Sequence, residues 1–570
     1  MKTKIFWPIV LILFMSFAFN MWGIGHDMPY CYEHDELNFV MTALSFGKGN
    51  LDPGSFIHGS FLYYFLFLQY AAFFLIKLLS GSVKSAHDFI SYYLTNPTPF
   101  FLIGRISTAI FSTVSIYLTY LIGKRIGGRR LSGVLASLFL GTSLLYVNMS
   151  HLVKEDIFYV FFMLLSFLSV LKAAKNNKFL YLSGFLIGFA LSVKYLSVLG
   201  LIFVFFGFVT NGKSAKEMIR GLVIAGCFAF AGFVIGQPYG LMHIRVFLEA
   251  IFGLKGHIFD KAIGDKPLYA SWYMYLVYLK RSFGIYILAA FLLSFLNIFN
   301  KVRARANILL LPFILVYFFF ISRAVHTQPS YLMGILPFIC IYTSIFISDL
   351  VTIISGTRQR LCILISTMIG FLLVAPSLMN SLRYDFLLTK PDTRAVSKKW
   401  IEENIPANST ILIESAFPRE IVHAPAILEN KACLEDEIKA IKQSGGSGIF
   451  WGMKIKQLEN SSLARYYVLK DGHFGKGALN KYSPEYIVVS SYYDHGFWVS
   501  KNDRQLFYND LLKNYSLIKN FEAMPYIVWF PSFCTLRENP ENLRYVDMLL
   551  PDQNLMAGPN IAIYQKKLRK

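Results

Sequence analysis

Long apolar runs recur along the first 380 residues of the chain, and short polar segments separate them. A helix that crosses a membrane needs roughly 20 predominantly apolar residues. The pattern therefore predicts a polytopic α-helical membrane protein. We expect eleven membrane-spanning helices, at residues 5–22, 100–122, 132–149, 156–172, 178–193, 195–210, 218–236, 283–299, 307–322, 330–348 and 361–380.

The first apolar run follows two lysines, Lys2 and Lys4, and so also has the look of a secretory signal peptide. Its apolar stretch is long, and no small-residue cleavage site follows it. These two features favour a retained first helix.

Basic residues set the expected orientation. They gather in the short loops near residues 124–130, 172–178, 213–216, 301–305 and 358–360. Cytoplasmic loops are enriched in Lys and Arg, so we place these loops inside the cell. The first loop, 23–98, then lies outside. Counting Phe61–Leu79 as a further span would invert all the later loops, so we predict an interfacial helix there.

Composition agrees with the membrane assignment. The chain of 570 residues is 55% hydrophobic, 17% aromatic and only 16% charged, and its net charge is +21. A charge of this size would also suit a nucleic-acid-binding protein, but its placement in short loops makes it a signal of topology.

The pattern changes after residue 382. Residues 383–570 lack long apolar runs and show ordinary helix and strand patterns, with a helix at Thr393–Glu403 and a strand at 485–490. An odd number of spans places this α/β domain on the extracytoplasmic side. A disulfide between Cys433 and Cys534 is possible there, although spacing alone does not establish it.

The expected topology collects polar groups on the outer face. Asp35 and Glu36 follow the first span, and Asp156 begins an apolar span, where an unpaired charge is costly. A carboxylate can accept a proton from an attacking hydroxyl or amine. Lys and Arg can hold a phosphate leaving group. Simpler interpretations stay open: a solvated loop for the first acids, and snorkelling to the interface for Lys194.

Several motifs, in this order and on one side of the membrane, carry a resemblance to a known family. They are Asp35-Glu36 after the first span, Phe56-Ile-His-Gly-Ser-Phe-Leu-Tyr-Tyr, Gly104-Arg105, the segment His151–Asp156, a glycine-rich stretch that ends in Lys194-Tyr195, and His326-Thr-Gln-Pro-Ser-Tyr331-Leu-Met-Gly-Ile-Leu-Pro. Together they resemble the membrane glycosyltransferases with the C-type fold, near the protein O-mannosyltransferases and the lipid A aminoarabinose transferases. Gly59 and Ser60 depart from that pattern, because relatives carry prolines after the histidine.

The resemblance implies an inverting transferase that takes a sugar from a polyprenyl-phosphate donor and passes it to a lipid, glycan or protein acceptor. In this assignment Asp35 is the general base, Glu36 assists or orients it, and Asp156 positions the acceptor. Residues expected on the donor side are Lys194, Arg323, His326, Tyr331 and His58. Some members of the wider fold bind a divalent metal, but the resemblance implies no required metal here.

Two other classes of function compete with this assignment. A transporter or flippase of a lipid-linked glycan also carries acids and cations at membrane depth. Transporters often consist of two related halves, and this sequence shows none. A non-catalytic scaffold or receptor would leave Asp35, Asp156 and Lys194 without a task.

Overall fold

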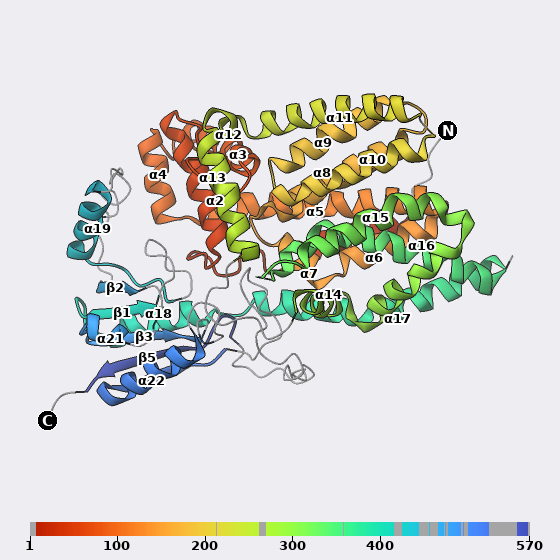
Figure 1. Cartoon of the computed structure of the whole chain (residues 1–570). Coiled ribbons are helices and arrows are strands. Elements are labelled where there is room, and N and C mark those ends of the chain that lie inside the picture. The colour runs from red at the N-terminus through yellow and green to blue at the C-terminus, as the bar shows by residue number, and fades with distance from the viewer. Residues whose placement is uncertain are drawn as a thin grey trace.

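The apolar runs form long helices that lie side by side, and a small sheet lies at one end of them (Figure 1). This computed structural model describes residues 7–567 apart from 213, 261–269, 326, 357, 415–423, 444–454, 456–464, 472–473, 475–476, 492–493, 495–499 and 524–555. Cys534, whose disulfide with Cys433 the sequence left open, lies outside the described residues.

All eleven predicted spans are helical. The helices are α1 (Trp7–Met21), α5 (Thr98–Gly127), α6 (Arg130–Gly141), α7 (Leu144–Ser150), α8 (Glu155–Lys172), α9 (Lys178–Leu191), α10 (Leu201–Thr210), α11 (Ala215–Gly236), α14 (Ser271–Ser294), α15 (Ala304–Ile321), α16 (Leu336–Ser355) and α17 (Gln359–Leu388). The polytopic helical membrane fold is thus confirmed.

Length and composition separate these helices into two groups. Among the described residues, seven helices are long and apolar enough to cross a membrane, or eight if the bent pair α6 and α7 forms one span. The seven include α3 (Phe61–Leu79), which we predicted to be interfacial. The helices α1, α8 and α9 and the segment Tyr195–Thr210 are shorter or more charged. The count of eleven crossings stays a prediction.

One predicted helix begins at the wrong residue. We expected a span at 283–299, but α14 already begins at Ser271, and a 3₁₀ turn extends it to Phe299. The helix breaks at Gly284, whose φ of 76° lies in the left-handed region that suits glycine. Polar residues before this break interrupt the apolar run, so the sequence pattern hides the first half of the helix.

Glycines allow α9 and α11 to approach closely. Gly184 and Gly188 lie one turn apart on α9, and a Cβ atom added to Gly188 would lie 1.7 Å from the carbonyl oxygen of Ala229 on α11. Small residues four apart permit this kind of backbone contact between membrane helices. The contact holds α11 against α9, whose end leads into Lys194.

Further helices gather at the end of the bundle that faces the sheet (Figure 1). They are α2 (His34–Ser45), α3, α4 (Ala86–Thr95), α12 (Pro238–Met242) and α13 (Ile244–Lys255). The helices α2, α3 and α4 all belong to the first loop, 23–98. Residues of α2 and α3, among them Phe39, Val40, Leu62 and Leu66, are buried in the same apolar core as the long helices. The first loop is therefore a packed part of the fold.

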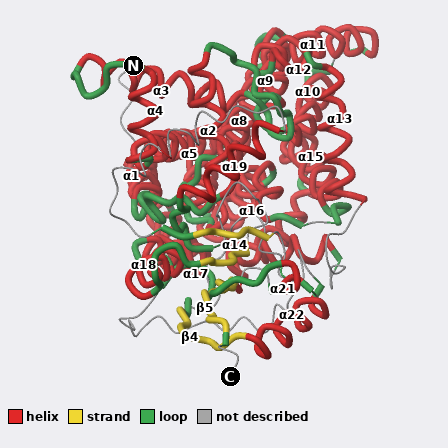
Figure 2. The backbone as a smooth tube through the Cα atoms, turned by 90° about the vertical axis from the view of Figure 1, so that its left-hand side faces the viewer, coloured by secondary structure: helices red, strands yellow, loops and turns green. Residues whose placement is uncertain are grey.

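The C-terminal region forms the predicted α/β domain (Figure 2). Its sheet has the strand order β2-β1-β3-β5-β4. The strands are β1 (Thr410–Glu414), β2 (Tyr467–Asp471), β3 (Tyr486–Ser490), β4 (Tyr515–Phe521) and β5 (Ile561–Lys566), and the helices are α18 (Thr393–Asn404), α19 (Lys431–Gln443), α21 (Ala478–Lys481) and α22 (Lys501–Asn514). Strands β1, β2 and β3 are parallel, while β5 is antiparallel to both β3 and β4.

Alternate residues of β1 face two different cores. Ile411 and Ile413 pack in a cluster with Ile401 of α18, whereas Leu412 packs with Phe507 of α22. This alternation follows from the pleat of a strand and shows that helices cover both faces of the sheet. The helix α17 runs through the predicted boundary at residue 382 and ends at Leu388, so a helix of the bundle leads directly to this domain.

Replacing Gly188 with leucine is expected to separate α9 from α11. The new side chain meets backbone, which cannot move aside as a flexible side chain can, and overpacking of this kind costs about 1–3 kcal/mol. The melting temperature of the detergent-solubilised protein should fall. The control is Gly226→Leu on α11, where an added Cβ meets no atom within 4 Å. Equal melting temperatures for the two variants would contradict the packing argument.

Candidate functional site

A fully buried arginine holds the first loop in place. Arg105 lies on α5, and its guanidinium donates two hydrogen bonds to the Glu36 carboxylate, from Nε to Oε1 at 2.9 Å and from Nη2 to Oε2 at 2.6 Å. Its other N–H groups donate to the carbonyl oxygens of Ile24 and His26, both at 2.9 Å, and to Oδ1 of Asp27 at 3.0 Å. A guanidinium has five N–H donors in a fixed plane, and all five are used here.

The Glu36 side chain is consequently occupied on every side. It is fully buried, and its Oε1 also accepts a hydrogen bond of 2.7 Å from the backbone N–H of Val153. This contact joins the start of α2 to the loop before α8. The geometry gives Glu36 no face for a substrate and supports the role of orienting its neighbour Asp35.

Two pairs of acids occupy the first turns of two helices that begin near each other. Asp35 and Glu36 lie in the first turn of α2, and Glu155 and Asp156 lie in the first turn of α8. Carboxylates are stabilised there by the partial positive charge at a helix N-terminus. The Glu36 contact with Val153 brings the two helix starts together, so Asp35 of the first pair lies near Glu155 of the second.

Asp35 is held as a carboxylate by a buried lysine. Its Oδ2 lies 2.5 Å from Nζ of Lys154, which also contacts Oε1 of Glu33 at 3.3 Å. Burial alone would raise the pKa of Asp35, but the attraction of Lys154 and His58 outweighs it, and the pKa is lowered below its usual value. Asp35 is thus ionised at neutral pH and able to accept a proton.

His58 bridges the two acid pairs. Its Nδ1 lies 3.4 Å from Oε1 of Glu155, and its Nε2 lies 4.0 Å from Oδ1 of Asp35. Burial lowers the pKa of His58, but the charge and hydrogen bond of Glu155 raise it further, so the net shift is upward. The Glu155 carboxylate thus stabilises the imidazolium form of His58.

Lys194 forms the second ammonium–carboxylate pair. Its Nζ lies 2.6 Å from Oδ1 of Asp156 and 3.4 Å from Oε1 of Glu155. Asp156 is fully buried, and its Oδ2 has no hydrogen-bond partner among the described residues. The pKa of Lys194 is raised because these carboxylates outweigh the effect of burial. An ammonium has three donors, so one remains for a ligand.

The structure brings together most of the predicted site residues. Asp35, His58, Asp156 and Lys194 are linked by the contacts above, and Tyr331 lies within electrostatic range of Lys194 and Asp156. Arg323 is exposed, and its guanidinium lies over the ring of Phe319, 5.8 Å from the centroid. Its described contacts include no other site residue. His326 lies outside the described residues.

Three charged residues of the site had no predicted role. Lys154 and Glu155 stand beside Asp156 in the sequence, and Glu33 stands beside the first acid pair. The run of charges at 151–156 was the available signal, but it does not reveal which acid each lysine meets. We refer to Glu33, Asp35, His58, Lys154, Glu155, Asp156 and Lys194 as the charged cluster.

The donor set of the charged cluster does not fit a divalent metal ion. Among the residues that the structure describes, no group of three or more His, Cys, Asp or Glu side chains could hold one. Ammonium groups face the acids instead: Lys154 faces Asp35, and Lys194 faces Asp156. The two lysines thus supply the positive charge that a divalent ion supplies in a metal-binding site. Independence from a metal stays a prediction.

The arrangement combines a proton acceptor with an anion-binding group. Asp35 can take a proton, and Lys194 can donate to a negatively charged oxygen. Both groups are largely buried. Electrostatic interactions are stronger in such a site than in water, because its effective dielectric constant is lower. Such a site suits a transfer reaction in which a nucleophile loses a proton while an anion departs.

A family model matches one segment of the bundle. Residues 101–236 match the family described as dolichyl-phosphate-mannose-protein mannosyltransferase. The segment includes Asp156 and Lys194 but begins after Asp35, and it is less than half of the chain. No curated protein matches the sequence.

Solved structures are similar over most of the chain. The oligosaccharyltransferase of Archaeoglobus fulgidus in its apo form has a TM-score of 0.50 at 11% identity, covering 91% of this chain and 74% of that one. ArnT from Cupriavidus metallidurans, bound to undecaprenyl phosphate, has a TM-score of 0.48 at 11% identity and covers 90% and 95%. The mycobacterial arabinofuranosyltransferase AftD has a TM-score of 0.45 at 12% identity and covers 98% and 40%.

These comparisons confirm the predicted resemblance. The chain has the fold of the C-type membrane glycosyltransferases, which the oligosaccharyltransferase match supports, and the family model places the resemblance on residues 101–236.

Removing the Arg105 guanidinium is expected to displace the first loop. Arg105→Met leaves Glu36 buried and uncompensated, which costs about 3–5 kcal/mol. The double variant Arg105→Met with Glu36→Gln should recover part of this loss, because it removes both charges. Melting temperatures of the wild type, both single variants and the double variant test the pair. Strictly additive effects would contradict a direct interaction.

The charged cluster is expected to lose stability as the pH rises. A histidine with a raised pKa contributes stability that is fully present below its unfolded value of about 6.5. That contribution is lost as the pH rises through the folded pKa of His58. Melting temperatures of the wild type and His58→Gln should therefore converge at alkaline pH. His87→Gln, at an exposed position in α4, is the control and should leave the wild-type profile unchanged.

Proposed function

We propose that this chain, which has the fold of the C-type membrane glycosyltransferases, is an inverting glycosyltransferase. It moves a sugar from a polyprenyl-phosphate donor to a lipid, glycan or protein acceptor. The observation that carries the proposal is the Asp35 carboxylate, held ionised by Lys154 and joined through His58 and Glu155 to the Lys194 ammonium.

Asp35 serves as the general base. As the acceptor oxygen or nitrogen attacks the anomeric carbon of the sugar, its proton passes to the Asp35 carboxylate. The bond between the anomeric carbon and the phosphate oxygen breaks, and the electron pair leaves with the phosphate. Attack from the side opposite the leaving group inverts the anomeric centre. Glu36 and Arg105 keep the base in place without contacting the substrate.

Lys194 serves the leaving group. Two carboxylates lie close to its ammonium, and its remaining N–H can donate to a phosphate oxygen. His58, in its imidazolium form, adds positive charge beside Lys194, and Tyr331 lies within range of the same group. The family description names a dolichyl-phosphate sugar donor, which agrees with a phosphate at this point.

The reaction takes place on the extracytoplasmic side. Basic residues gather in the loops at the opposite end of the long helices, such as the one around Arg129 and Arg130, and such loops stay in the cytoplasm. The helix α2, whose first turn carries Asp35, lies with the α/β domain at the other end of the bundle (Figure 1). A polyprenyl-phosphate headgroup would reach the cluster at this membrane surface.

Asp35→Asn is expected to reduce sugar transfer by roughly 10²-fold or more, because general-base catalysis contributes about 10²–10⁴-fold. The assay follows radiolabelled sugars on polyprenyl phosphate in membranes that contain the protein and measures label leaving the lipid. Asp88→Asn, in α4 of the same loop, is the charge-matched control and should keep wild-type activity. Full activity of Asp35→Asn would contradict the assignment of Asp35 as the general base. If the folded wild type releases no label with any common sugar, the alternative function as a transporter of a lipid-linked glycan would be favoured.

A further inference from the structure

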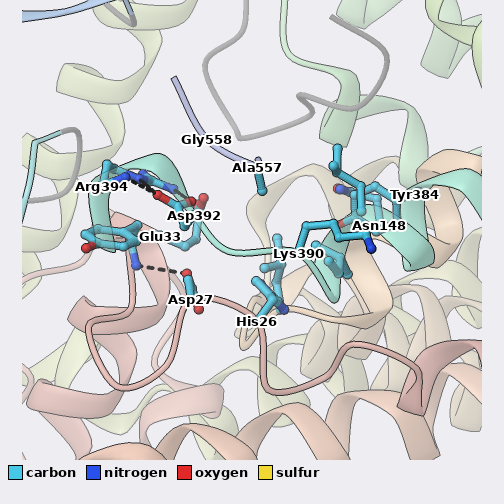
Figure 3. A pocket seen from close by; sticks show the side chains of 14 residues that line it. His26, Asp27, Glu33, Asn148, Tyr384, Lys390, Asp392, Arg394, Ala557 and Gly558 are labelled. Carbon is cyan, nitrogen blue, oxygen red and sulfur yellow. Dashed lines mark hydrogen bonds and ion pairs between the residues drawn. The ribbon is translucent and has the colours of Figure 1, made fainter. Parts of the chain in front are cut away.

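A pocket with a mainly apolar lining and a few polar groups lies beside the charged cluster, and the catalytic assignment does not use it (Figure 3). Residues of the first loop, among them His26 and Glu33, form one side. The end of α17 and the residues after it, including Tyr384 and Lys390, form another, and Ala557 and Gly558 of the α/β domain close it. We refer to this as the interdomain pocket.

The α/β domain contacts the first loop beside this pocket. Within the domain, the backbone N–H of Thr393 donates to the carbonyl oxygen of Ala557 at 2.8 Å, and the N–H of Ala557 donates to the carbonyl oxygen of Pro391 at 2.9 Å. The Arg394 guanidinium, paired with Asp392, lies 3.9 Å from the ring centroid of Tyr32 in the first loop. The domain therefore contacts the same loop that carries Asp35.

Most charges that line the pocket are already paired. Asp27 accepts from Arg105, Asp392 from Arg394, and Glu33 contacts Lys154. Lys390 differs: its described contact is with the ring of Phe386, 4.3 Å from the centroid, and no carboxylate lies within 4 Å of it in the described parts of the chain. The pocket thus presents one ammonium without a counter-charge.

An unpartnered acceptor atom lines the same pocket. Asn148 is only 3% exposed, and its Oδ1 has no hydrogen-bond partner among the described residues. A buried polar atom without a partner is costly, so a ligand that donates a hydrogen bond there would be favoured. In Figure 3, Asn148 and Lys390 lie on the same side of the pocket.

Two contacts of Lys154 link the pocket to the base. Lys154 contacts Asp35 at 2.5 Å and Glu33 at 3.3 Å, and Glu33 lines the pocket. His58 and Glu155 link Asp35 to Lys194. A base that removes a proton from the acceptor must meet the acceptor on the side away from the leaving phosphate.

We propose that the interdomain pocket binds the acceptor and selects one that carries a phosphate near a free hydroxyl group. Lys390 meets the phosphate, the Asn148 Oδ1 accepts from the hydroxyl, and Leu152, Leu387 and Leu388 face the apolar part of the molecule. Lysine is a common phosphate-binding residue. Identifying the bound molecule as the acceptor rests on the proposed function, while the binding itself can be tested without it.

The first experiment measures melting temperatures of the full chain in detergent with racemic glycerol 3-phosphate, with glycerol and with short-chain phosphatidic acid. A ligand at roughly ten times its dissociation constant should raise the melting temperature by about 2 °C. Glycerol 3-phosphate should stabilise the wild type, and glycerol should not. Stabilisation by phosphatidic acid alone would identify a lipid acceptor, and equal stabilisation by both phosphates would identify a soluble or glycan-borne group.

Variants locate the binding. Lys390→Gln should abolish the stabilisation, and Asn148→Asp should also weaken it, because a new carboxylate repels phosphate. Lys399→Gln, at an exposed position in α18, is the matched control and should respond as the wild type does. Lys194→Gln should also keep the response, since Lys194 does not line the pocket.

Two results would overturn the proposal. One is a wild type that neither phosphate stabilises. The other is a response lost in Lys194→Gln but kept in Lys390→Gln, which would place the phosphate at Lys194, where the phosphate of the sugar donor is proposed to bind. A positive binding result together with an inactive wild type in the sugar-transfer assay would contradict the proposed function alone.

Discussion

The fully buried pair of Arg105 and Glu36 is the interaction on which the rest of the site depends. Taking two charges out of water is costly, and a buried pair is stable only when every donor and acceptor is satisfied. Here all five guanidinium N–H groups are used, and three of them meet carbonyl oxygens of 24 and 26 or the carboxylate of Asp27. One helix of the bundle thereby fixes the loop before α2 and the first turn that presents Asp35.

Charge balance explains why the neighbouring acids can coexist at such short distances. Glu33, Asp35, Glu155 and Asp156 bring four negative charges into a region mostly withdrawn from water, and the two lysines alone would leave an excess that repels phosphate. A protonated His58 reduces this excess, and its position between Glu155 and Asp35 stabilises its own charge. Protonation of His58 therefore reduces the net negative charge that an anionic ligand would meet at this site.

The sequence predicts the helices of this fold well but predicts side-chain partners poorly. Apolar runs are local signals, so the bundle and the later α/β domain could be inferred directly, and the hidden first half of α14 is the case where polar residues mask the run. The lysine that holds Asp35 lies far away in the sequence, and tertiary contacts such as that of Glu36 with Val153 bring them together. Likewise, no sequence signal shows that Arg323 is exposed at the side of Phe319.

The position of the α/β domain follows from the same physical constraint. The helix α17 ends at Leu388, and the few residues after it must pack on the first loop, where Arg394 stacks on Tyr32. Because Arg105 holds the first loop, the domain packs against an ordered surface beside Glu33. A molecule in the interdomain pocket would lie next to Glu33, which Lys154 links to Asp35. An ordered arrangement of this kind favours transfer, since catalysis depends on the orientation of the nucleophile.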